Sequence, residues 1–360
     1  MHEEDIQRLE EELRNTKYNK HTQFHIGQLK AKIARLKAES AKKSGGSKGQ
    51  GYSIRKSGDA TVLLVGYPSV GKSTLLNKIT NAESKVAEYE FTTLDVIPGV
   101  MEYNGAKIQI LDIPGIIEGA SEGKGRGREI LSVMRNADLI IIMADTERVE
   151  SARILEDELY NAGFRLNREA PNVVIHKRMT GGISLSSTVR SRKLNPELVR
   201  TVMNEFKMTN ADVIIREDIN VDQLIDSLMK NRLYVPYIKV LNKIDRISVE
   251  EARDFQNNGW MVISAEDGSN IEALRKTIWD KLDLIRIYMK RIGREPDMEK
   301  PLIIKSPATV QDIANKIHRE AFGHKLEYAK IWGKSAKFPG QKIGVERVLR
   351  DEDILEMHMG

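Results

Sequence analysis

The feature that most constrains the fold is a glycine-rich run between a short apolar segment and a helical pattern. The run consists of Gly66, Tyr67, Pro68, Ser69, Val70, Gly71, Lys72 and Ser73, and Thr74 follows it. It matches the phosphate-loop pattern G-x-x-x-x-G-K-[ST]. Thr61–Val65 is predicted to be a buried strand before it, and Lys72–Thr80 a helix after it. This order predicts an α/β sheet whose loop holds a phosphate at a helix N-terminus.

The end of the phosphate loop and a second run, which begins at Asp112, complete a predicted phosphate and metal site. Lys72 can place its ammonium on the β- and γ-oxygens of a nucleotide, and Ser73 can offer its hydroxyl to Mg2+. A predicted strand ends in the run Asp112, Ile113, Pro114 and Gly115. We expect the Asp112 carboxylate to hold a water of the Mg2+ shell. We expect the Gly115 N–H to bond the γ-phosphate, so that loss of this phosphate releases the next segment.

A pair of threonines, Thr92 and Thr93, follows Phe91 between the first helix and the second strand. A threonine at this place can coordinate Mg2+ only while the γ-phosphate is present. The alternative is a β-forming pair that leads into a strand without any contact to the ligand.

The base specificity is predicted from a run that follows the strand Tyr237–Leu241. This run consists of Asn242, Lys243, Ile244 and Asp245. The Asp245 carboxylate offers two acceptors to the two adjacent donors of guanine, N1–H and the N2 amine, and adenine lacks that donor pair. We expect Asn242 to brace the phosphate loop and the stem of Lys243 to cover the base. Ser264, Ala265 and Glu266 follow the next predicted strand and fit a loop whose backbone N–H groups contact the guanine O6.

The remaining pattern predicts a doubly wound, mostly parallel sheet. Asn104-Gly105 predicts a hairpin between two strands, and Asp138–Ala144 reads as a buried parallel strand. A final helix is predicted over Ile271–Arg286. The stretch from Asp112 to Asn242 is about 70 residues longer than two strand–helix units need, so we expect a folded α+β insertion near 149–235.

Both ends of the chain lie outside this pattern. Residues 1–58 carry two short apolar stripes at helical spacing, which predict a helical hairpin followed by a Gly/Ser linker. The last part, about 291–360, reads as strand, helix and several short strands, a small α+β domain. We therefore divide the chain into 1–58, 59–290 and 291–360.

Charge and cysteine content indicate the kind of partner and compartment. The net charge is +5, yet residues 1–58 hold 13 Lys and Arg against 7 Asp and Glu. Such an arm attracts phosphate backbones, and the alternative is a solvated helix face. The chain has no cysteine and no long apolar run. We therefore expect a cytoplasmic protein without a membrane span, and its oligomeric state stays open.

The motifs together resemble the developmentally regulated GTP-binding (DRG) proteins within the Obg-like GTPases. The resemblance rests on GYPSVGKSTLLNKIT (66–80), EFTTLDVIPG (90–99), LDIPGIIEGASEGKGRG (111–127), HKRMTGGISLSST (176–188) and NADVIIREDIN (210–220). It implies that Thr93 is the Mg2+ ligand, that residues 1–58 form a helix-turn-helix-like arm and that 291–360 is a β-grasp TGS domain. It also implies contact with ribosomes or RNA, through residues 15–56 and the TGS domain. A related branch that prefers ATP lacks the aspartate present here as Asp245.

The predicted activity is Mg2+-dependent hydrolysis of GTP to GDP and phosphate, with Lys72, Thr93 and Gly115 as catalytic groups. Small GTPases place a glutamine after the glycine of D-x-x-G to orient water, and this chain has Ile116. We hypothesise slow turnover that K+ or docking to the ribosome accelerates. Relatives hold K+ with an asparagine of the phosphate loop, where this chain has Ser69. The alternative function is an RNA- or ribosome-binding adaptor for which GTP is a structural ligand.

Overall fold

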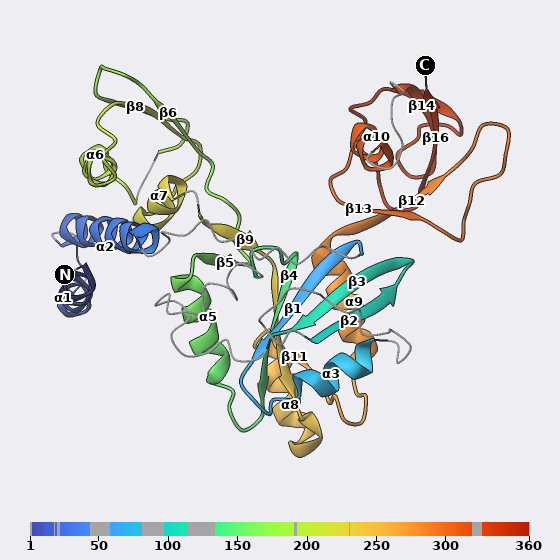
Figure 1. Ribbon diagram of the computed structural model, residues 1–360, viewed down its shortest axis with the longest axis horizontal. Coiled ribbons are helices and arrows are strands. Elements are labelled where there is room, and N and C mark those ends of the chain that lie inside the picture. The colour runs from blue at the N-terminus through green and yellow to red at the C-terminus, as the bar shows by residue number, and fades with distance from the viewer. Residues whose placement is uncertain are drawn as a thin grey trace. The chain divides into compact units, whose positions relative to one another are not determined.

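The computed structural model describes residues 2–17, 19, 22–43, 58–80, 97–113, 134–190, 193–229, 231–318 and 326–359. The chain divides into two compact units (Figure 1). One unit joins residues 1–51 to 163–234, and the other joins 52–162 to 235–360.

The unit formed by residues 52–162 and 235–360 is built on a six-stranded sheet with the order β11-β10-β4-β1-β3-β2. Its strands are β1 (Ala60–Gly66), β2 (Ile97–Tyr103), β3 (Ala106–Asp112), β4 (Leu139–Asp145), β10 (Tyr237–Asn242) and β11 (Met261–Val262). All neighbours are parallel except β2 and β3. Every residue of β1 and β4 is buried. The prediction of a mostly parallel α/β sheet is confirmed.

Helices cover both faces of this sheet. They are α3 (Lys72–Ile79), α5 (Ser151–Asn161) and α9 (Ile271–Leu282), whereas α8 (Val249–Asn257), beside the edge strand β11, and the short helix η1 (Ile244–Arg246) have no buried residue. Figure 1 shows α5 on one side and α3 and α9 on the other. Val62 and Leu64 of β1 pack in one cluster with residues of α3 and α9. The predicted hairpin is present, and its turn residues Asn104 and Gly105 have φ values of 50° and 79°.

One helix ends earlier than the sequence pattern predicts. The helix expected over Ile271–Arg286 ends at Leu282, where Asp283 adopts a left-handed conformation with φ 52°. The next residues form β12 (Leu284–Met289), which is the first strand of a separate sheet. The alternation of β-branched and polar residues in LIRIYM favours a strand, and packing against other strands decides the outcome.

The unit formed by residues 1–51 and 163–234 combines the N-terminal helices with most of the predicted insertion. It holds α1 (His2–Asn15), α2 (Gln23–Lys43), β5 (Phe164–Leu166), β6 (Val173–Lys177), β7 (Ile183–Ser187), α6 (Pro196–Glu205), β8 (Ala211–Ile215), α7 (Val221–Leu228) and β9 (Leu233–Val235). Ala31 of α2 is fully buried in the same cluster as α6 and α7. A Cβ on Gly27 would lie 2.7 Å from Leu198, so α2 approaches α6 closely. Helix α2 is therefore part of this core, whereas Leu9 of α1 packs with Leu29 and Leu36 of α2 in a separate cluster.

The C-terminal residues form a second sheet with the order β13-β12-β16-β14-β15. After β12 come β13 (Leu302–Lys305), α10 (Val310–His318), β14 (Leu326–Trp332), β15 (Gln341–Ile343) and β16 (Asp353–Met359). Side chains of α10 such as Ile313 pack on one face of this sheet. The sheet begins at Leu284, before the boundary predicted at 291, because β12 pairs with both β13 and β16. The insertion likewise begins after α5, since that helix packs on the central sheet.

Candidate functional site

The glycines of the predicted phosphate loop stand where no side chain fits. Gly71 is the N-cap of α3 with φ 94°, and a Cβ there would lie 2.3 Å from Nδ2 of Asn242. A Cβ on Gly66 would lie 2.7 Å from the carbonyl oxygen of Met143. Any larger residue at either position would displace backbone or the Asn242 amide. The loop therefore keeps a tight turn directly before the N-terminus of α3.

Lys72 points back into this loop. Its ammonium donates hydrogen bonds to the carbonyl oxygens of Gly66 at 2.9 Å and Tyr67 at 3.2 Å. Burial lowers the pKa of Lys72, and the nearby charge of Asp112 offsets part of this effect. The loop thus places a cation beside the backbone turn, where a phosphate group would replace carbonyl contacts.

Ser73 and Asp112 meet although 39 residues separate them in the chain. The Ser73 hydroxyl donates to Oδ2 of Asp112 at 3.0 Å. The other carboxylate oxygen, Oδ1, is buried and makes no hydrogen bond within the described residues. A hydroxyl beside a carboxylate with one unsatisfied buried oxygen fits Mg2+ and its bound waters, because this cation prefers oxygen ligands.

Asn242 joins the phosphate loop to the loop after β11. Its side-chain amide donates to the carbonyl oxygen of Val70 at 2.9 Å, which is the predicted brace. Its Oδ1 accepts a hydrogen bond from the backbone N–H of Ala265, also at 2.9 Å. Ser264 and Ala265 are buried, whereas Glu266 is exposed. Since the Ala265 N–H is already used, the Glu266 N–H is the better donor for a ligand in this loop.

Lys243 and Asp245 follow with different environments. Lys243 adopts a left-handed conformation with φ 66°, and its ammonium donates to Oδ2 of Asp145 at 2.7 Å. Asp245 lies in η1 with an exposed carboxylate. Within the described residues this carboxylate makes no hydrogen bond or ion pair, so both of its oxygens can accept from a ligand.

Asp145 is a residue of the site that the sequence analysis missed. It is the last residue of β4, and its backbone-facing Oδ1 accepts from the N–H of Arg148 at 3.0 Å. Burial raises the pKa of Asp145, but the hydrogen bond from Lys243 and further hydrogen bonds outweigh it, so the pKa is lowered overall. The acid is thus ionised and fixes Lys243. A single aspartate at the end of an apolar strand gives no sequence pattern that would reveal this role.

Some of the predicted site residues lie outside the residues that the structure describes. They are Phe91, Thr92, Thr93, Pro114, Gly115 and, beside them, Ile116. The other predicted site residues are those of the phosphate loop, Asp112, and the two loops predicted to contact the base. They lie at the ends of the neighbouring parallel strands β1, β3, β4, β10 and β11. Ligands of such sheets bind at these carboxyl ends.

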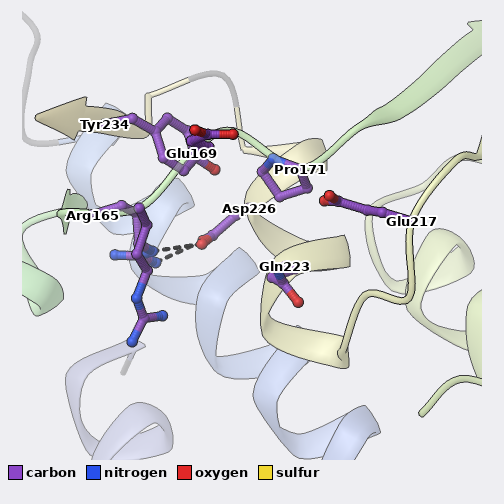
Figure 2. A pocket seen from close by; sticks show the side chains of 8 residues that line it. Arg165, Glu169, Pro171, Glu217, Gln223, Asp226 and Tyr234 are labelled. Carbon is purple, nitrogen blue, oxygen red and sulfur yellow. Dashed lines mark hydrogen bonds and ion pairs between the residues drawn. The ribbon is translucent and has the colours of Figure 1, made fainter. Parts of the chain in front are cut away.

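A cavity of about 270 Å3 lies in the unit formed by residues 1–51 and 163–234 (Figure 2). It is lined by Arg165, Arg168, Glu169, Pro171, Glu217, Gln223, Asp226 and Tyr234. Asp226 accepts from Nε of Arg165 at 2.5 Å and from Nε of Arg232 at 2.7 Å. These ion pairs tie β5 to α7. None of the predicted nucleotide-binding residues lines this cavity.

Comparison with family models divides the chain into three matches. Residues 61–177 match the model described as a 50S ribosome-binding GTPase. Residues 180–284 match the model for the C-terminal region of that domain. Residues 285–359 match the TGS domain, which confirms the predicted identity of the C-terminal module.

Relatives cover nearly the whole chain. An uncharacterized GTP-binding protein of Methanocaldococcus jannaschii is 48% identical and aligns with 98% of this chain and 92% of its own length. Developmentally-regulated GTP-binding protein 2 of Homo sapiens is 44% identical, with 98% of both chains aligned. Developmentally-regulated G-protein 3 of Arabidopsis thaliana is 45% identical over 98% of this chain and 97% of its own. A solved structure of Aquifex aeolicus Era is 20% identical with a TM-score of 0.33, covering 76% of this chain and 72% of that one. Among the described helices, none is long and apolar enough to cross a membrane.

Proposed function

Because the chain belongs to the developmentally regulated GTP-binding family, we propose that it hydrolyses GTP to GDP and phosphate as a switch on the ribosome. The observation that carries the proposal is the contact between the phosphate loop and the base-reading run that begins at Asn242. The Asn242 side chain contacts the phosphate loop on one side and the loop after β11 on the other. A triphosphate held at Lys72 would therefore lie within the same site as a base read by Asp245.

The phosphate end of the site stabilises negative charge. The N–H groups that open α3 and the Lys72 ammonium would face the β- and γ-phosphates, and a leaving γ-phosphate gains charge as its bond to the β-phosphate breaks. Among the described residues the Lys72 ammonium donates hydrogen bonds only to carbonyl oxygens, so it can turn to phosphate without breaking an ion pair. We propose Thr93 and Gly115 as the groups that detect the γ-phosphate.

Mg2+ would be held by Ser73 and Asp112, with Thr93 as the proposed third group of this chain. When bound, the cation neutralises charge on the β- and γ-oxygens. The buried, unsatisfied Oδ1 of Asp112 supports this assignment, because a water of the Mg2+ shell would satisfy it.

The base end selects guanine through one exposed carboxylate. Asp245 would accept from N1–H and the N2 amine of guanine, while Lys243, held by Asp145, keeps its aliphatic stem in a fixed place. Adenine would leave this carboxylate desolvated and unmatched. We therefore propose GTP rather than ATP as the substrate.

We propose slow intrinsic turnover, because Ile116 follows Gly115 and cannot hydrogen-bond an attacking water. K+ beside the phosphates, or contact with the ribosome, would then supply the missing stabilisation. Ser69 is exposed in the loop and offers a hydroxyl to such an ion. Hydrolysis rates measured in KCl and in NaCl, with and without ribosomes, test this step. Equal, fast rates in both salts without ribosomes contradict it.

The ribosome proposal rests on the distribution of charge. The GTPase body, residues 52–162 and 235–284, holds 19 Lys and Arg against 26 Asp and Glu, a net charge of −7. The basic unit, residues 1–51 and 163–234, holds 23 against 15, a net charge of +8. The TGS domain, residues 285–359, holds 15 against 11, a net charge of +4. Positive charge thus gathers outside the GTPase body, where it would attract RNA in the cytoplasm.

Two measurements on the same preparation test the proposed function. Single-turnover hydrolysis of GTP by the full chain, with Lys72→Ala as the inactive control, tests the enzymatic part. Co-sedimentation with ribosomes, with GDP and with a non-hydrolysable GTP analogue, tests the switch. We expect the analogue to increase ribosome binding. Binding that is equal in both nucleotides would favour an adaptor for which GTP is a structural ligand.

A further inference from the structure

Arg275 lies one turn into α9 and reaches the far end of α3. Its Nη2 donates a hydrogen bond to the carbonyl oxygen of Ile79 at 2.9 Å and a longer one to that of Lys78 at 3.5 Å. These carbonyl groups belong to the last turn of α3, where a helix leaves its acceptors without intrahelical partners. A cation at this place also meets the negative end of the helix dipole. Arg275 therefore caps the helix that begins at the phosphate loop.

The two helices that Arg275 joins begin at the two ends of the candidate site. Helix α3 begins directly after the phosphate loop. Helix α9 begins directly after residues 263–270, which we call the base loop because they include the predicted base contacts Ser264, Ala265 and Glu266. Both helices lie on the same side of the sheet (Figure 1), and Leu76 and Leu274 belong to one buried cluster there. A shift of α3 against α9 would therefore move the phosphate loop against the base loop.

The base loop is fixed to α9 and to the sheet by its own hydrogen bonds. The Gly268 N–H donates to the carbonyl oxygen of Ser264 at 3.0 Å, which closes the loop on itself. The side chain of Asn270, at the N-cap of α9, donates to the carbonyl oxygen of Val262 in β11, also at 3.0 Å. Because these bonds tie the loop to the elements on either side of it, the position of α9 sets the position of the base loop.

A second, weaker link between the base loop and the last turn of α3 is electrostatic. Hydrogen bonds from Ser269 lower the pKa of Asp267, and the nearby positive charge of Lys78 lowers it further. Asp267 and Lys78 are both exposed, so water and salt screen their attraction. This attraction has the same direction as the Arg275 contact, since it also draws the end of α3 towards the base loop.

Asn242 supplies the corresponding contact at the other end of α3. Its side chain joins Val70 of the phosphate loop to Ala265 of the base loop. The eight residues of α3 span about 12 Å between this contact and that of Arg275. A polar contact at one end alone leaves a helix free to tilt about that end, whereas contacts at both ends fix its direction. Asn242 and Arg275 together therefore fix α3 relative to the base loop.

We propose that Arg275 is a positioning residue for guanine nucleotides, which keeps the phosphate subsite at Lys72 and the base subsite at Asp245 at the separation that one nucleotide spans. A nucleotide is a bivalent ligand of such a site, because its base and its phosphates occupy two subsites at once. Its affinity depends on the separation of the subsites, whereas the affinity of either piece alone does not. The inference rests on the proposed nucleotide site, and Arg275 acts in it through α3.

Affinities of the full chain for GDP and for its two pieces, guanosine and pyrophosphate, test the proposal in Mg2+. Calorimetry measures GDP, and competition against a fluorescent GDP analogue measures the pieces. Arg275→Met should weaken GDP binding about tenfold, because a small misplacement of binding groups is costly. The affinities for guanosine and for pyrophosphate should each change by less than about twofold, because each piece uses one subsite only.

Two further variants serve as rescue and control. Arg275→Lys should restore most of the GDP affinity, because Nη1 and Nη2 make the contacts of Arg275, whereas its Nε makes no hydrogen bond within the described residues. Lys276→Met removes a positive charge from an exposed position of the same helix and should bind GDP as the wild type does. Equal losses in Lys276→Met and Arg275→Met would overturn the proposal.

The pattern of losses separates positioning from a general effect on the fold. The proposal is overturned if Arg275→Met binds GDP at wild-type strength, or if it loses guanosine and pyrophosphate as strongly as GDP. If Arg275→Met does not fold, Arg275→Gln replaces it under the same criteria, because its amide is polar but too short to keep the Ile79 contact. A wild-type chain that binds no GDP would instead contradict the proposed function.

Discussion

The GTPase body and the two modules beside it carry opposite net charge. The body, with a net charge of −7, holds every residue that we assign to the nucleotide, while the basic unit and the TGS domain carry +8 and +4. A phosphate site in an acidic body must act through groups at contact distance, such as the loop N–H groups and Lys72. The modules, in contrast, can act through a field that many lysines and arginines share. Changes in the body should therefore alter nucleotide chemistry, and changes in the modules should alter RNA contact.

The largest effect should come from the base-reading carboxylate. Asp245→Asn replaces one acceptor by a donor, so the preference for GTP over the xanthosine nucleotide should fall by about 10^4. Competition binding with both nucleotides measures this change. RNA binding without nucleotide should stay at the wild-type level, because Asp245 lies in the GTPase body. An unchanged guanine preference would show that another group reads the base.

The second effect concerns hydrolysis. Lys72→Ala removes the ammonium that would stabilise charge on the β- and γ-oxygens, and the single-turnover rate should drop by about 10^2 to 10^3. The melting temperature without nucleotide serves as the folding control. A variant that folds and still hydrolyses GTP at the wild-type rate would remove Lys72 from the mechanism.

A third, smaller effect divides the basic residues of the basic unit into exposed residues and residues that are paired with an acid. Lys177 and Arg200 are exposed, whereas Lys30 is paired with Asp222 at 2.7 Å. Lys177→Glu/Arg200→Glu should weaken ribosome co-sedimentation about tenfold and reduce its salt dependence. Lys30→Gln should leave sedimentation nearly unchanged, because its charge is already paired, and should cost less than about 1 kcal/mol of unfolding free energy. Equal effects on sedimentation would mean that charge pairing inside the unit is irrelevant to RNA contact.

The last effect concerns Asp145 and is similar in size. Asp145→Asn releases Lys243 without touching the ligand, so nucleotide affinity should weaken about tenfold while the preference for guanine is kept. Since the pKa of Asp145 is lowered, its contribution is present above its ordinary pKa and is lost only as the pH falls below that value. Wild-type affinity measured between pH 5 and 8 should show no step from this group. A loss of guanine preference in the variant would make Asp145 a specificity residue.

The sequence predicted the parts of the fold that depend on local pattern. The strand, loop and helix around Lys72 and the hairpin at Asn104-Gly105 follow from periodicity and turn chemistry, and the structure contains them. The joint core of α2 with α6 and α7 was not predicted, because Gly27 and Ala31 make contacts across more than a hundred residues. The end of α9 at Leu282 was missed since strand pairing, a tertiary effect, overrides a continuous apolar pattern.

The same distinction holds for the candidate site. Residues within a motif were found, and the contact of Asn242 with Val70 was predicted as a brace. Two contacts could not be predicted from the sequence: the ion pair of Asp145 with Lys243, and the hydrogen bond from the Ala265 N–H to Asn242. Each is a single hydrogen bond between segments that are distant in the sequence.

Isothermal titration calorimetry of the purified full chain with GDP, GTP and ATP in Mg2+ most directly tests the claim that the acidic body binds guanine nucleotides. The account predicts heat and a single site for GDP and GTP, with ATP weaker by about 10^3 or more. No heat for GDP or GTP, or equal affinity for ATP, would contradict it.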